Sequence, residues 1–119
     1  MGRRSRRGER LKAPESDYRD AEGNVLSLRG SLTPGARREY AAAAAGPGRP
    51  AETVEDARQR ALELLFERLA VRWVIAGAPI ERQRELLARL RIASQAEREW
   101  VRGVLREHCA EHFPELPAP

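Results

Sequence analysis

Cysteine, lysine and aromatic residues are all scarce in this sequence. Cys109 is the only cysteine, so an intramolecular disulfide is excluded and a reducing compartment is expected. Two Trp, two Tyr and two Phe leave few large side chains from which to build a core. A chain of 119 residues is therefore expected to form one domain, with a core near the lower limit for independent stability.

Long hydrophobic runs are also missing. The longest apolar run near the centre, residues 70–76, is interrupted by Arg72 and is far too short to span a bilayer. After its basic start the chain continues into Pro14-Glu15-Ser16-Asp17 without an apolar segment, which does not fit a secretory signal. These two absences predict a cytoplasmic protein that makes no membrane contact.

Positive charge is abundant, but it is concentrated at one end of the chain. The formal net charge is +4, and residues 1–12 alone carry six basic side chains against Glu9, a net +5, which leaves −1 for residues 13–119. Residues 1–16 are polar and lack periodicity, so they predict a disordered basic arm. Such an arm favours contact with nucleic-acid phosphates. Its predicted binding residues are Arg3, Arg4, Arg6, Arg7, Arg10 and Lys12.

A central helix is predicted over residues 54–76. Thr53 is placed as its N-cap, Asp56 stands in a capping-box position, and Gly77 follows the expected end. Apolar residues recur at helical spacing and predict one buried stripe. The stripe consists of Leu62, Leu65, Phe66, Leu69, Trp73 and Ala76.

Leu64, Val71 and Ile75 would form a second apolar stripe on the opposite side of the same helix. A helix that is apolar on two sides has to be covered on both. Either neighbouring elements of the same chain sandwich it, or a partner protein or second copy covers it, and the sequence leaves both alternatives open. These three residues are the predicted interface.

Two further helices are predicted by apolar periodicity, at about 79–93 and 95–113, the second beginning with a capping box formed by Ser94 and Glu97. The connections are short, so consecutive helices should be neighbours. The expected fold class is all-α, a small bundle of three principal helices.

The segment before the bundle is predicted to hold two smaller elements. Thr33-Pro34 predicts the start of a short helix over about 34–45, and Gly23-Asn24 is compatible with a small hairpin over 18–29. A Gly/Pro-rich linker follows. The expected organisation is an arm (1–16), a hairpin, helix and linker (17–52) and a bundle (53–119), within a single domain.

Residues 108–112, His-Cys-Ala-Glu-His, have the H-x-x-E-H pattern, which resembles that of the inverted zincin metallopeptidases. In those enzymes two histidines one helical turn apart bind zinc, and the glutamate activates water. A further carboxylate ligand comes from well downstream, and here only seven residues follow. Both histidines also fall on the apolar side of the last helix, so we interpret the pattern as coincidental and expect no metal site.

Arg98, Arg102 and Arg106 recur at i, i+4 and i+8 on the last helix, opposite its apolar side. This arginine ladder is a second candidate nucleic-acid contact. The alternative is a solvated face balanced by neighbouring glutamates. A helix-turn-helix comparison over residues 84–106 fits poorly, because Arg91 and Glu97 fall where a small turn residue and a buried apolar residue are usual.

Together these observations predict a small, non-enzymatic cytoplasmic accessory protein without metal or cofactor. Its basic arm would contact nucleic acid or a nucleoprotein complex. The alternative function is a homodimer or protein-binding adaptor that uses the second apolar stripe of the central helix.

Overall fold

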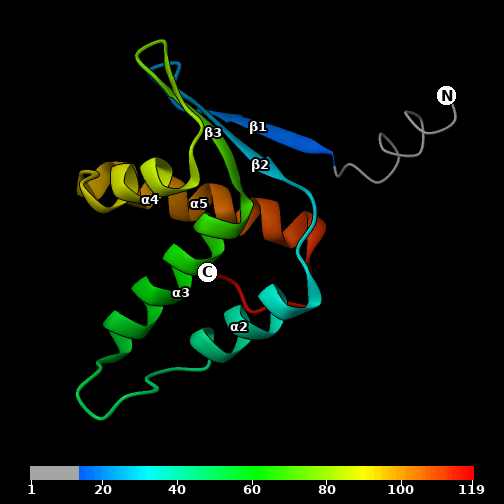
Figure 1. The fold of residues 1–119 in the computed structure, drawn as a ribbon, viewed down its shortest axis with the longest axis vertical. Helices are drawn as coiled ribbons and strands as arrows, with labels where there is room; N and C mark the ends of the chain where they lie inside the picture. Colours follow the sequence, from blue (N-terminus) through cyan, green and yellow to red (C-terminus); the bar gives the residue numbers. More distant parts are fainter. Residues whose placement is uncertain (1–13) are drawn as a thin grey trace, which may run out of the picture.

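The computed structural model describes residues 14–119 and shows four helices and one antiparallel sheet (Figure 1). The expected all-α bundle is therefore wrong, and the fold is mixed α/β. In chain order the elements are β1 (Glu15–Arg19), β2 (Val25–Arg29), α2 (Pro34–Ala44), α3 (Val54–Leu69), β3 (Ala70–Ile75), β4 (Ala78–Ile80), α4 (Gln83–Arg91) and α5 (Gln95–His112).

The sheet has the strand order β1-β2-β3-β4, with every neighbouring pair antiparallel. The hairpin expected over 18–29 is present, but it begins earlier and pairs through β2 with β3, far along the chain. Glu15 and Ser16 consequently belong to β1 and not to the arm predicted for residues 1–16. The rest of that arm, residues 1–13, lies outside the described residues.

The predicted helix over 54–76 is the largest error, because α3 ends at Leu69 and the chain continues as a strand. Ala70 leaves the helix in an extended conformation, with φ −68° and ψ 126°. Residues 70–75 are rich in β-branched and aromatic side chains, which favour strands, and β2 supplies the hydrogen-bonding partner. Trp73 is buried in this strand, as it would have been on a helix, so apolar periodicity could not distinguish the two.

The predicted helix over 79–93 is also only partly correct. Its first residues form β4, which pairs with the end of β3, and the helix itself is α4, with Leu86 and Leu90 buried. The two remaining helices begin where their caps predicted: Thr33 caps α2, and Ser94 caps α5 in a capping box with Glu97.

One face of the sheet packs on the helices. Tyr18, Leu26, Trp73 and Ile80 lie side by side across the four strands, and all four belong to or pack against the buried core. Figure 1 shows the helices gathered on this side. Antiparallel sheets commonly face solvent on the other side. The core cluster runs from Leu26 to Phe113, so residues before and after the Gly/Pro linker share one core.

The β3–β4 turn yields a test of the corrected assignment. Ala76 and Gly77 have φ of 50° and 81°, the conformation of a two-residue type I′ hairpin turn, in which Asn-Gly is the preferred pair. Ala76→Asn should therefore raise the free energy of unfolding by about 1 kcal/mol, because asparagine tolerates the left-handed region better than alanine.

Chemical denaturation measures this change. Ala42→Asn, on the exposed side of α2, is the matched control and should lower stability by about 0.5 kcal/mol through helix propensity. If Ala76→Asn destabilises the protein as the control does, residue 76 is helical and our strand assignment is incorrect.

Candidate anion-binding site

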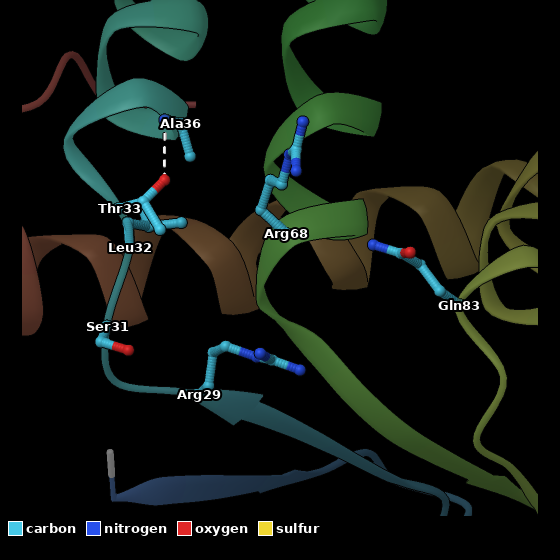
Figure 2. Close-up of a pocket in the computed structure, with 7 residues that line it drawn as sticks. All are labelled: Arg29, Ser31, Leu32, Thr33, Ala36, Arg68 and Gln83. Atoms are coloured by element: carbon cyan, nitrogen blue, oxygen red, sulfur yellow. Dashed lines mark hydrogen bonds between the residues drawn. The ribbon is translucent and has the colours of Figure 1, made fainter. Parts of the chain in front are cut away.

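A hollow of about 200 Å³ lies where β2 ends, α2 begins and α3 makes its last turn (Figure 2). Two arginines and several hydroxyl and amide groups line it, and no acidic side chain is present among the described residues of its lining. The lining includes Arg29, Ser31, Thr33, Ala36, Arg68 and Gln83. This composition suits a small anion.

The two arginines approach the hollow from different elements. Arg29 extends from the end of β2, and Arg68 projects from the last turn of α3 (Figure 2). The guanidinium of Arg68 is turned along α3, away from Arg29, and lies 3.3 Å from a carboxylate oxygen of Glu39. Both partners of this ion pair are about half exposed, and exposed pairs contribute at most about 1 kcal/mol. An entering anion can therefore compete with Glu39 for Arg68 at little cost.

Of the two helix ends at the hollow, only the amino end of α2 complements an anion. The amino end of α2, the positive end of its dipole, borders the hollow, with the Ala36 amide donating to Thr33 Oγ1 at 3.0 Å. The carboxyl end of α3 has the opposite polarity. There Gln83 Nε2 donates to the Glu67 carbonyl oxygen at 2.9 Å, which satisfies one of the exposed carbonyl groups.

His108 fixes the end of β2, and with it the backbone of Arg29. Its Nε2 lies 2.8 Å from the Arg29 carbonyl oxygen, and its Nδ1 lies 2.8 Å from the Tyr18 hydroxyl. Because a carbonyl can only accept, Nε2 carries the proton and Nδ1 accepts from Tyr18. The imidazole is fully buried, and this burial lowers the pKa of His108 below its usual value.

Of the two H-x-x-E-H histidines, His108 is hydrogen-bonded within the protein, whereas His112 Nε2 is buried without a hydrogen-bond partner among the described residues. Both ring nitrogens of His108 are hydrogen-bonded within the protein, and the His112 ring packs 4.4 Å from it, centroid to centroid. Within residues 14–119 no group of three or more His, Cys, Asp or Glu side chains is placed to hold a metal ion. Burial raises the pKa of Cys109 to about 11, so its thiol stays protonated and is a poor nucleophile at neutral pH.

No family model, curated protein or solved structure matches this chain. Its function therefore has to be inferred from the geometry of its own residues.

The basic segment joins the described structure beside the hollow. The Pro14 carbonyl oxygen accepts a hydrogen bond from the Gly30 amide at 2.8 Å, and Glu15 is paired with Arg29 in the β1–β2 register. Residues 1–12, with the arginines and the lysine predicted to bind nucleic acid, lie outside the described residues. Their attachment point nevertheless lies next to Arg29, a proximity that the sequence did not reveal. Neither Arg29 nor Arg68 stands in a motif that would have marked it.

The arginine ladder of α5 is largely occupied with the protein's own backbone. Arg98 donates to the carbonyl oxygens of Ala93 and Arg91 at 3.2 Å each, at the carboxyl end of α4. Arg106 donates twice to the Pro119 carbonyl oxygen, at 3.2 and 3.1 Å. Only Arg102 makes no hydrogen bond or ion pair with another described residue. The ladder is thus a weaker candidate for phosphate binding than the sequence suggested.

The predicted interface residues do not share one helical face. Leu64 lies on α3, whereas Val71 and Ile75 lie on β3. Leu64 and Ile75 pack against the core, and Val71 is half-buried at a register shift between β2 and β3. The second stripe of a central helix, on which the adaptor alternative depended, is therefore not present. In residues 14–119 no helix has the length and apolarity needed to cross a membrane.

The buried histidine predicts how stability depends on pH. The unfolded chain protonates His108 near the ordinary pKa of histidine, 6.5, whereas the folded protein does so only at lower pH. The free energy of unfolding should therefore be highest above pH 6.5 and should fall as the pH drops from there towards the folded-state pKa.

His108→Gln should flatten this decline, and at pH 7.5 it should cost about 1–3 kcal/mol through the lost hydrogen bonds. Urea denaturation between pH 5 and 8 measures both effects, with His112→Gln as the matched control. An unchanged pH profile in His108→Gln would contradict the assignment of the acid sensitivity to His108.

Proposed function

We propose that this protein is a non-enzymatic cytoplasmic protein that binds the phosphate backbone of nucleic acid, alone or within a nucleoprotein complex. The basic arm, residues 1–12, and the Arg29–Arg68 hollow act as one surface. A single observation carries the proposal: the Pro14–Gly30 hydrogen bond attaches the arm next to Arg29.

Phosphate neutralisation supplies the attraction. The arm carries a net +5, and each phosphate that it neutralises releases condensed counterions, which favours binding at low salt. Twelve extended residues reach about 40 Å, so an arm rooted at the hollow can follow a strand whose phosphate rests between Arg29 and Arg68. The two contacts raise each other's effective concentration because they belong to one chain.

The hollow of about 200 Å³ has room for one phosphate group. Ser31 and the amino end of α2 add hydrogen-bond donors of the kind that phosphates use. Phosphate contacts carry no base information, and sequence preference should therefore be slight. The arm and the hollow should bind duplex and single strands alike.

The arm can be tested by the salt dependence of binding. Affinity for a short duplex should fall with salt with a log–log slope of about −4 to −6, corresponding to five or six phosphate contacts. Deletion of residues 2–12 should remove most of this slope and leave the melting temperature almost unchanged. Fluorescence anisotropy from about 25 to about 200 mM salt measures the slope. The proposal fails if the truncated protein binds as tightly as the intact chain.

The hollow can be tested by substitutions that remove either a positive or a negative charge. Arg29→Gln and Arg68→Gln should each weaken binding and together reduce the slope by about 1, because they contact one phosphate. Glu39→Gln should tighten binding several-fold, because it frees the guanidinium of Arg68. Glu22→Gln, an equal charge change in the β1–β2 turn, is the matched control. If both glutamate variants tighten binding equally, only net charge acts and the hollow is not a site.

A further inference from the structure

A second hollow, of about 390 Å³, lies between α2, α3 and the chain's last residues, with α5 at one side. This volume is within the range of small-molecule pockets, about 300–1,000 Å³. Figure 1 shows the red C-terminal segment ending in the space between α2 and α3. The residues that matter for its chemistry are Tyr40, Ala44, Val54, Ala61, Arg58 and Arg102.

Specific hydrogen bonds hold the C-terminal wall of this hollow in place. The Tyr40 hydroxyl donates to the Pro117 carbonyl oxygen at 2.7 Å, and Arg106 donates twice to that of Pro119. Ala118 and Pro119 then line the hollow opposite the helices. Anchored elements thus form the walls of the hollow.

The inner surface is mostly apolar. Alanines of α2 and α3 face each other across it, and their small side chains leave the space unfilled. Val54, at the start of α3, is 65% exposed and lies at the rim. It is one of only two large hydrophobic side chains that are exposed within residues 14–119. An apolar group entering the hollow would cover it.

Two guanidinium groups supply the only side-chain charge among the described residues that line this hollow. Arg58 interacts with Glu55 at 3.9 Å, at an exposed position. Arg102 is half-buried and has no ion-pair partner within residues 14–119. It also borders an adjoining shallow depression, which contains Glu55 and Glu99. A partly desolvated guanidinium that forms no ion pair within residues 14–119, beside an apolar wall, favours a ligand that carries a carboxylate.

We propose that this hollow binds a medium-chain fatty-acid carboxylate. The head group would accept a bidentate pair of hydrogen bonds from the Arg102 guanidinium, with Arg58 as a second cation at the rim. The acyl chain would lie on the alanines between α2 and α3 and cover Val54. This inference is independent of the proposed nucleic-acid contact, because it uses neither the arm nor the Arg29–Arg68 hollow.

Decanoate is the probe, with decanol as the neutral analogue and butyrate as a head group without a long chain. Calorimetric titration of the full chain should show saturable binding of decanoate at one site. Decanol should bind about ten-fold more weakly, because it lacks the charge that Arg102 pairs, and butyrate should not bind measurably. Failure of decanoate to saturate one site, or equal affinity for decanoate and decanol, would overturn the proposal.

Two variants locate the site. Arg102→Gln should weaken decanoate about ten-fold or more and leave decanol within about two-fold. Ala44→Leu should fill the hollow and lower the affinity for both ligands, whereas Ala42→Leu, on the exposed side of the same helix, should lower neither affinity.

Circular dichroism confirms the folding of each variant. Amide chemical shifts of Ala57 and Ala61 on adding decanoate report occupancy directly, even if one variant misfolds. Unaltered decanoate affinity in folded Ala44→Leu, or unmoved Ala57 and Ala61 signals in the parent, would show that the ligand binds elsewhere.

Discussion

The antiparallel pairing of β2 with β3 is the constraint on which the rest of the structure depends. It joins segments about 45 residues apart in the chain and draws the β1–β2 hairpin and the α3–β3–β4 segment into one sheet. Without it, residues 70–75 would pair only with the three-residue strand β4, and little would oppose continuation of α3. The row from Tyr18 to Ile80 then provides a flat apolar face for the helices. Because the pairing is non-local, folding has to close a long loop before this face exists.

The same pairing sets the place of the proposed anion site. It ends β2 at Arg29, next to the last turn of α3, so that residues from two separate elements border one hollow. His108 then holds the Arg29 carbonyl from α5. A buried, neutral imidazole thus couples the position of Arg29, a proposed binding residue, to the stability of the core. In our proposal, the arm supplies most of the positive charge, and the fold determines where the arm is attached.

Local sequence signals predicted where the helices begin. They could not predict which distant segments pair as strands. Caps at Thr33, Thr53 and Ser94 are short side-chain patterns that act within one turn, and each begins a helix where predicted. The end of α3 was missed because Leu69 and Trp73 are buried in either conformation, and only pairing with β2 and β4 decides between them. The hollow was missed for a similar reason: Arg29 and Arg68 are ordinary surface residues until the sheet brings them together.

The most direct test of the account is an amide chemical-shift map of the ¹⁵N-labelled full chain, titrated with a short duplex at low salt. The account predicts that, within residues 14–119, the largest changes fall on Arg29, Ser31, Ala36 and Arg68, and that the β1–β2 turn stays unmoved. Changes concentrated along the exposed side of α5, with the signals around Arg29 unmoved, would contradict it and would place the nucleic-acid contact on the arginine ladder.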